Sequence, residues 1–145
     1  MGETASNPGS HYTLNGIGPV IVVDDVGSDL KIFEVFYKKS KIKNPLLNFL
    51  SGTDLLDYLD KVESGNAEMP ALVFLDINMP KLNGHETLAK MRGRKSFESL
   101  PAVVMLTSST REEDRKKASE AGAMGYFVKP LDGSEYLQLF NTLIP

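Results

Sequence analysis

The sequence predicts an α/β fold: a doubly wound (βα)5 three-layer sandwich around a parallel five-stranded sheet. Two observations predict it. Five short apolar runs alternate with longer amphipathic segments, and turn residues flank most of the runs, as expected for buried parallel strands. Five β-α repeats within roughly 125 residues are typical of a doubly wound sandwich. Right-handed crossovers then leave few strand orders, of which 2-1-3-4-5 is the common one.

Each element is expected from a local pattern. The apolar runs predict strands at 20–23, 45–50, 71–75, 102–106 and 125–128. Apolar residues at helical spacing, together with charge placement that suits the helix dipole, predict helices at 28–39, 53–65, 84–93, 110–122 and 132–144. For the second helix we expect Thr53 as the N-cap and Gly65 as the stop.

Composition limits the classes of function. The 145 residues suit one domain with a sizeable core. A net charge of −3 gives no electrostatic case for binding nucleic acid or an anionic membrane, and the absence of cysteine excludes thiol chemistry and disulfides. No apolar stretch approaches the roughly 20 residues of a membrane span. Residues 1–18 are polar and lack a secretory pattern, so we expect a disordered N-terminal extension before a domain at 19–145, with the cytoplasm as the default location.

Polar side chains follow four of the five expected strands. Asp24 and Asp25 follow the first strand, Asp76 the third, Thr107 the fourth and Lys129 the fifth. One such aspartate alone is commonly a helix cap or a loop residue. In open α/β sheets, however, the site lies outside the carboxyl ends of the strands, at the point where the strand order reverses. We therefore expect all of these side chains to converge on one pocket.

The residue types in this pocket indicate phosphoryl chemistry. Three close carboxylates repel each other unless a cation is present. Mg²⁺ prefers oxygen ligands and is commonly held by one or two carboxylates together with a phosphate. A lysine and a hydroxyl can bind the remaining phosphoryl oxygens, and a carboxylate can itself attack phosphorus. The pocket therefore predicts Mg²⁺-dependent transfer of a phosphoryl group onto an aspartate.

Four motifs carry a family resemblance. The segments VVDD, LDINMPKLNG, LTSS and GYFVKP, in this order, resemble the signatures of the response-regulator receiver domain, also called the CheY-like domain, over residues 19–145. The chemotaxis member of that family has the strand order 2-1-3-4-5, so the order expected above is not independent of the resemblance. A chain ending near the last helix implies a stand-alone single-domain regulator, although a receiver cut from a larger regulator would look the same.

The resemblance implies a role for each residue of the acidic cluster. Asp76 is the phosphoacceptor, which takes a phosphoryl group from a sensor histidine kinase, a histidine phosphotransfer protein or a small donor. Asp25, Asp76 and the backbone carbonyl of Asn78 ligate Mg²⁺, for which Mn²⁺ can substitute, and Asp24 acts through water. The domain would catalyse only its own phosphorylation and dephosphorylation, so it is not an enzyme acting on a separate substrate.

The resemblance also implies a switch. Thr107 and Lys129 contact the phosphoryl group, and Tyr126 is the aromatic residue that turns inward when Thr107 moves, although an ordinary half-buried tyrosine is the alternative. The Lys129–Pro130 bond is typically cis in this family. Output would pass to a downstream protein through the face formed by 110–122, 125–128 and 132–144, or onward in a phosphorelay. The histidine His85 is expected on a solvated helix start, and the REEDRKK run on a solvated helix face.

Three other classes of protein share part of this pattern. A haloacid-dehalogenase-type phosphatase has a second aspartate in its DxDx[TV] motif, where this chain has Asn78, and a phosphatase assay would separate the two. A flavodoxin-like FMN carrier shares the fold, but the loop DDVGSD would repel a phosphate. A pseudo-receiver that only binds partners would be expected to lack one of the five matching residues.

Overall fold

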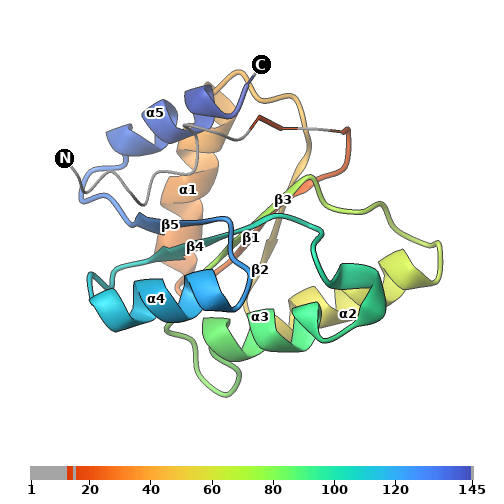
Figure 1. Cartoon of the computed structure of the whole chain (residues 1–145). Coiled ribbons are helices and arrows are strands. Elements are labelled where there is room, and N and C mark those ends of the chain that lie inside the picture. Colours follow the sequence, from red (N-terminus) through yellow and green to blue (C-terminus); the bar gives the residue numbers. More distant parts are fainter. Residues whose placement is uncertain (1–12, 15, 145) are drawn as a thin grey trace.

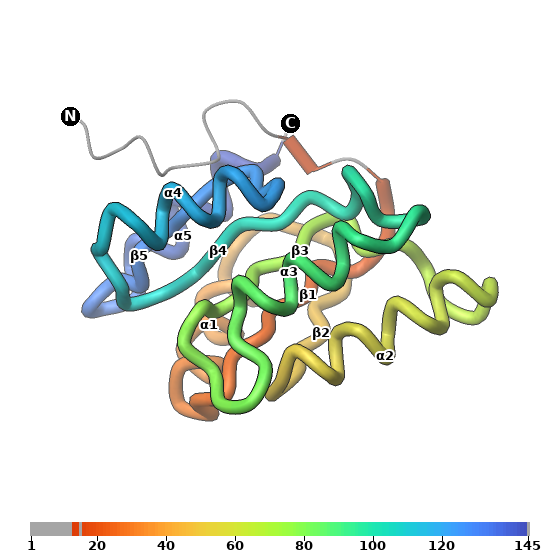
Figure 2. The backbone as a smooth tube through the Cα atoms, turned by 60° about the horizontal axis from the view of Figure 1, so that its bottom comes forward, coloured from red at the N-terminus to blue at the C-terminus, as the bar shows by residue number. Residues whose placement is uncertain are grey.

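The computed structural model describes residues 13–14 and 16–144, and its centre is a parallel sheet in the order β2-β1-β3-β4-β5. This confirms the predicted fold class and strand order, which can be followed from β5 across to β2 in Figure 2. The strands are β1 (Val20–Val23), β2 (Leu46–Phe49), β3 (Leu72–Leu75), β4 (Val103–Thr107) and β5 (Gly125–Val128).

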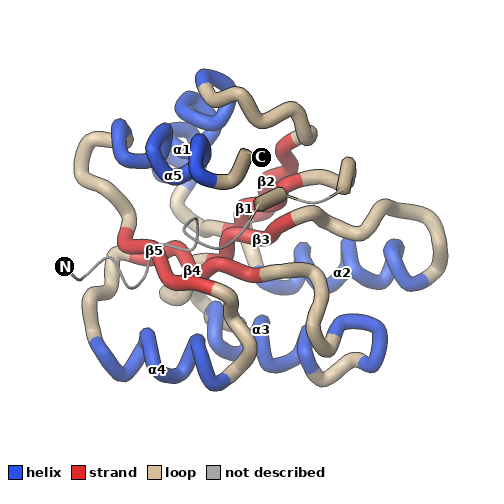
Figure 3. The backbone as a smooth tube through the Cα atoms, turned by 45° about the horizontal axis from the view of Figure 1, so that its top comes forward, coloured by secondary structure: helices blue, strands red, loops and turns tan. Residues whose placement is uncertain are grey.

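Helices cover both faces of the sheet. On one face lie α1 (Gly27–Lys39) and α5 (Ser134–Thr142), and on the other lie α2 (Gly52–Glu63), α3 (Gly84–Arg92) and α4 (Glu112–Glu120) (Figures 1 and 3). Because both faces are covered, the central strands β1 and β3 are apolar and buried throughout and not alternating. Successive residues of β1 therefore join different cores: Ile21 and Val23 pack towards α2, α3 and α4, whereas Val20 and Val22 pack towards α1 and α5.

The two cores differ in chemistry. The core beneath α1 and α5 is aromatic, and the ring centroid of Phe33 lies 5.1 Å from those of both Phe74 and Phe140 in edge-to-face geometry. The core beneath α2, α3 and α4 is mainly aliphatic, with Leu55 and Leu88 fully buried. The two layers are therefore packed independently on either side of one sheet.

The start of α2 differs from the prediction. Ser51, not Thr53, is the N-cap: its side chain accepts a hydrogen bond from the backbone N–H of Asp54 at 3.1 Å. Both residue types cap helices, and β2 ends early enough for Ser51 to take the position, which leaves Thr53 exposed in the first turn. Gly65, with φ of 82°, follows the helix end as expected.

Two further local features were not expected. Asn83 and Glu86 form a reciprocal capping box at the start of α3. A short 3-10 helix, η3 (Lys95–Phe97), follows α3 and buries Phe97 completely in the aliphatic core. The capping box fixes where α3 begins, and this start also fixes the end of the loop after β3.

The expected cis bond at Lys129–Pro130 is wrong. Within the described residues, the cis peptide bond is Leu100–Pro101. X–Pro bonds favour trans by only about 0.5–1 kcal/mol, so a proline at a given place does not determine the isomer.

The N-terminal extension at 1–18 and the domain boundary at residue 19 stay predictions. Residues 1–12 and 15 of the expected disordered extension lie outside the described part of the chain. The backbone N–H of Leu14 donates to the carbonyl of Leu143 at 2.7 Å, and the Asn44 amide donates to the carbonyl of Gly18 at 2.7 Å. In the described part of the chain, no helix combines the length and apolar character that a bilayer crossing requires.

Candidate functional site

The three aspartates lie together at the carboxyl edge of the sheet. One carboxylate oxygen from each of Asp24, Asp25 and Asp76 lies within 4.8 Å of the others. The register explains this closeness: Val23 is paired with Leu75, so the residues that follow β1 and β3 are neighbours, and the Asp76 N–H donates to the Val23 carbonyl at 3.0 Å. Asp24 and Asp76 are only 2% and 3% exposed, so their charges need partners.

Lys129 supplies the positive charge of this site. Its Nζ lies 2.6 Å from Oδ2 of Asp24 and 3.6 Å from Oδ2 of Asp76. Its backbone N–H donates to the carbonyl of Thr107 at 2.8 Å, which fixes the lysine directly beyond β5. The expected convergence of the strand-end side chains is therefore what the geometry shows for the aspartates and the lysine.

A fourth carboxylate was missed from the sequence. Asp29, in the first turn of α1, accepts a hydrogen bond from Lys129 Nζ at 2.8 Å. An acid in the first turn of a helix is usually explained by the helix dipole. The one available signal was its place four residues after Asp25, where a helix that follows β1 begins beside the site.

Burial and neighbouring charges act on Asp76 in opposite directions. The net pKa of Asp76 is raised to about 6, mainly by burial; the charge of Lys129 and a backbone hydrogen bond from Asn78 oppose the rise, and the charges of Asp24 and Asp25 add to it. Burial also lowers the pKa of Lys129, but hydrogen bonds to Asp24 and Asp29 outweigh it, so that the net shift is upward. Lys129 is therefore charged at neutral pH, and Asp76 is mostly ionised.

The donor set fits a hard cation. Oδ1 of Asp25 is buried and has no hydrogen-bond partner among the described residues. Asp24 differs, because its Oδ1 accepts from the Val26 N–H at 2.9 Å and its Oδ2 pairs with Lys129. Asp25 therefore has an oxygen free for direct ligation, whereas both oxygens of Asp24 are already engaged. Asp24 also has the ordinary role of an aspartate in a loop, because its side chain accepts the backbone N–H of Val26 two residues later.

The loop after β3 brings Asn78 to the same edge. Ile77 and Met79 are buried in the aliphatic core, and Asn78 between them is exposed. The Gly84 N–H donates to the Ile77 carbonyl at 2.8 Å, which closes the loop before α3. A Cβ atom on Gly84 would collide with the backbone carbonyl of Asp76 and lie 2.7 Å from Ile77 Cα, so the loop requires glycine there.

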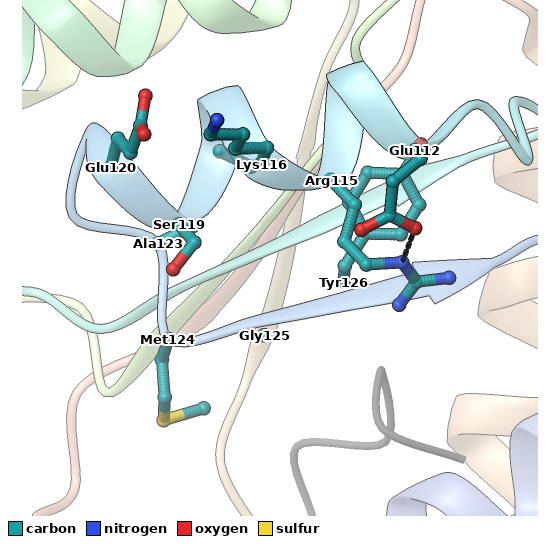
Figure 4. Close-up of a pocket in the computed structure, with 10 residues that line it drawn as sticks. Glu112, Arg115, Lys116, Ser119, Glu120, Ala123, Met124, Gly125 and Tyr126 are labelled. Atoms are coloured by element: carbon teal, nitrogen blue, oxygen red, sulfur yellow. Dashed lines mark ion pairs between the residues drawn. The ribbon is translucent and has the colours of Figure 1, made fainter. Parts of the chain in front are cut away.

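Thr107 and Tyr126 both contact the loop between β4 and α4. Thr107 is the last residue of β4, is completely buried, and accepts the Ser109 N–H on its Oγ1 at 3.2 Å. The Tyr126 hydroxyl donates to the Ser109 carbonyl at 2.9 Å, and the Arg115 guanidinium lies 4.8 Å from the centre of the tyrosine ring (Figure 4). Tyr126 is thus buried and lies back along β5 from the acidic cluster, linked to Thr107 through Ser109.

The expected solvation of His85 and of the REEDRKK run is partly wrong. Oγ of Ser109 donates to Oδ2 of Asp114 at 2.7 Å, and Oδ1 of Asp114 lies 3.1 Å from His85 Nε2. These contacts lower the pKa of Asp114, mainly through the hydrogen bond from Ser109 and then through His85. Asp114 and Arg115 are half-buried because they lie on the inner side of α4, and only the remaining residues of the run are solvated.

A groove of about 450 Å³ lies between α4 and β5. It mixes charges of both signs with the Tyr126 ring, and Figure 4 shows Glu112 paired with Arg115 at one end. Its lining therefore combines an aromatic surface with charges of both signs.

Comparison with known proteins identifies the family. The model of the response regulator receiver domain matches residues 20–141, so the chain belongs to this family, and it is a receiver domain of two-component signalling. It is 38% identical over 80 residues to the probable methanogenesis regulatory protein FilR2 of Methanothrix harundinacea, covering 55% of this chain and 51% of that protein. It is 31% identical over 119 residues to the sensor histidine kinase CheAY of Helicobacter pylori, covering 81% of this chain and 14% of that one.

Response regulator Rcp1 of Synechocystis sp. is similar over more of its length. It is 30% identical over 111 residues, which cover 76% of this chain and 75% of Rcp1. The crystal structure of the Mn²⁺-bound form of Rcp1 superimposes with a TM-score of 0.73 at 26% identity, covering 86% of this chain and 89% of that one. The chain spans only about half the length of FilR2, so activities of such longer proteins are not transferred to it. A divalent metal at the acidic cluster agrees with the geometry of the three aspartates and with the Mn²⁺-bound form of Rcp1.

Proposed function

We propose that this domain accepts a phosphoryl group on Asp76. The observation that carries the proposal is the convergence of Asp24, Asp25 and Asp76 with Lys129 at one edge of the sheet. Asp76 is the carboxylate that follows the central strand β3, and it lies within reach of the lysine and beside the two other acids. Because its pKa is about 6, it is mainly the nucleophilic carboxylate at neutral pH.

The transfer would proceed by attack of an Asp76 carboxylate oxygen on the phosphorus of a phosphohistidine. The new O–P bond forms as the P–N bond breaks, and the imidazole leaves with the electron pair and takes up a proton. Lys129 and the Thr107 hydroxyl would bind the phosphoryl oxygens, which spread their charge over this site during transfer. The Lys129 ammonium already contacts Asp24 and Asp76, whereas Thr107 would have to move from the end of β4 to contact the phosphoryl group.

Asp25, Asp76 and the Asn78 carbonyl would hold Mg²⁺, and Asp24 would act on it through water, with Mn²⁺ as a substitute. The ion would neutralise the carboxylates and the incoming phosphoryl group. The buried oxygen of Asp25 without a partner supports this assignment.

Output would follow from the Ser109 link. If Thr107 moves towards a phosphoryl group, Ser109 moves with it, and the Tyr126 hydroxyl that holds the Ser109 carbonyl must respond. This would alter the face formed by α4, β5 and α5, where a downstream protein or the next phosphorelay component docks. The groove between α4 and β5 lies on this face.

The donor that we propose is a sensor histidine kinase or a histidine phosphotransfer protein. The similarity to a segment of a sensor histidine kinase supports this class of partner. In this proposal the domain catalyses only its own phosphorylation and dephosphorylation and acts on no separate substrate. Nucleic acid and membrane are not among the proposed partners, and the cytoplasmic location stays a prediction.

Labelling from acetyl phosphate with Mg²⁺ tests the acceptor, with intact mass and peptide mapping as readouts. The parent should gain one acid-stable, base-labile phosphoryl group, and Asp76→Asn should gain none. Asp57→Asn, an exposed acid on α2, is the matched control and should label as the parent does. Label that persists in Asp76→Asn would place the acceptor elsewhere.

Thr107→Ala separates acceptance from switching. It should still label, but beryllofluoride should shift the NMR signals of Ser109 and Tyr126 much less than in the parent. Equal shifts in the two proteins would remove Thr107 from the switch.

A further inference from the structure

Lys129 is shared between two acids before any phosphoryl group arrives. Its Nζ is 2.6 Å from Asp24 and 2.8 Å from Asp29, but 3.6 Å from Asp76. An ammonium has three N–H donors and no acceptor. Two of them are committed to Asp24 and Asp29, so one remains for Asp76 or for a phosphoryl oxygen.

We propose that Asp29 is a positioning residue that sets how readily this domain accepts phosphoryl groups from different donors. The inference rests on the proposed function of Asp76. Asp29 fixes the orientation of the Lys129 ammonium, and its own negative charge disfavours small, highly charged donors.

Exposure supports the second part of this role. The side chain of Asp29 is 36% exposed, whereas those of Asp24 and Asp76 are 2% and 5% exposed. Asp29 therefore lies at the rim, where an approaching donor meets its charge directly. The carboxylates of Asp24, Asp29 and Asp76 surround the one ammonium of Lys129, and the excess negative charge repels a dianion more strongly than a less charged donor.

Replacement by asparagine isolates the charge. Asp29→Asn keeps an oxygen acceptor for Lys129 and removes the charge, so phosphorylation by acetyl phosphate should accelerate about 3- to 10-fold at low salt. Phosphoramidate has a protonated nitrogen that lowers its net negative charge. The rate of phosphorylation by phosphoramidate should therefore rise less in Asp29→Asn than the rate with acetyl phosphate. The rate with acetyl phosphate should also rise less with added salt in the variant than in the parent.

Replacement by alanine isolates the hydrogen bond. Asp29→Ala also removes the acceptor that orients Lys129, so it should be slower than Asp29→Asn with both donors. Phosphorylation is followed by mass spectrometry with saturating Mg²⁺, and Asp57→Asn is the control. A purely structural role would change both donors by the same factor.

The outcomes separate this inference from the proposed function. If the parent does not label at Asp76, the proposed function fails. If the parent labels and Asp29→Asn is no faster with acetyl phosphate, or accelerates both donors equally, the role in donor discrimination is wrong. If Asp29→Ala matches Asp29→Asn, the role in positioning Lys129 is wrong.

Discussion

His85 Nε2 lies 3.1 Å from Asp114 Oδ1, which ties the first turn of α3 to α4 across the aliphatic side of the sheet. Both side chains are only 14% exposed. The second oxygen of Asp114 accepts the Ser109 hydroxyl at 2.7 Å, so one carboxylate joins α3, α4 and the loop that follows β4. Arrangements of this kind couple energetically more than exposed ion pairs do.

A double-mutant cycle at this pair is the first prediction. Asp114→Ala should lower the free energy of unfolding by about 1–2 kcal/mol at pH 7, because it leaves partly buried donors unsatisfied. His85→Ala should cost less in the Asp114→Ala background than in the parent, with a coupling energy of about 0.5–1 kcal/mol. Urea denaturation measures both. Strictly additive effects would show that the contact contributes nothing, and Asp57→Ala provides the exposed control.

The raised pKa of Asp76 predicts a pH-dependent stability difference. Between its usual value of 3.8 and its folded value of about 6, the folded protein binds more protons than the unfolded chain. Stability from this group is therefore present at low pH and is lost as pH rises through 6. At pH 7.5 in EDTA, Asp76→Asn should therefore be more stable than the parent and unfold at a higher temperature. At 1.36 kcal/mol per pKa unit, the gain in the free energy of unfolding is at most about 3 kcal/mol.

The same comparison at pH 4 is the internal control. There the carboxyl is protonated in the folded state, so the two proteins should differ little. Lys129 keeps Asp24 and Asp29 as partners in both. A stability difference that is constant from pH 4 to 7.5 would contradict the assigned cause.

Metal binding should stabilise the domain through Asp25. Mg²⁺ at ten times its dissociation constant adds about 1.4 kcal/mol by mass action, which is a rise of several degrees in Tm for a chain of this size. Asp25→Asn should abolish most of the rise, because it removes the charge of an oxygen that is buried and unpartnered. Asp57→Asn should retain the rise. Thermal scans with and without EDTA make the measurement, and an undiminished rise in Asp25→Asn would move the site away from this residue.

A pair of glycines tests the loop after β3. Gly84→Ala places a Cβ against the backbone of Asp76 and Ile77, so either the loop or the start of α3 must shift. We expect a loss of about 1–3 kcal/mol in stability and weaker binding of Mg²⁺. Gly27→Ala in α1 meets nothing within 4 Å, and it should be neutral or should stabilise by up to about 1 kcal/mol. Equal behaviour of the two variants would mean that the close approach at Gly84 is unimportant.

Much of the fold followed from short-range patterns. Runs such as 71–75 had to be buried on both faces, and the polar residue after each run had to lie at one edge of a parallel sheet. This is why Asp76 and Lys129 could be placed together although they are far apart in the chain. The choice between Ser51 and Thr53 could not be made, because both satisfy the same capping chemistry.

The missed contacts of Asp29 and of His85 are long-range pairs of side chains. Asp29 meets Lys129 across 100 positions, and His85 meets Asp114 across 29. Each of the four residues has an ordinary explanation within its own helix or strand. Only the packing of α1 beside the end of β5, and of α3 beside α4, brings them into contact, and no local pattern encodes those approaches.

The pleat of the sheet assigns the site residues to opposite phases. Asp76 follows Phe74 by two positions and Lys129 follows Phe127 by two, and both phenylalanines pack towards α1 and α5. Thr107 instead follows Met105 by two positions, and Met105 packs towards α2, α3 and α4. Since one residue reverses the phase of a strand, a single insertion or deletion in β4 would turn the threonine hydroxyl to the aromatic layer. The length of β4 should therefore tolerate far less variation among related chains than the lengths of the loops around it.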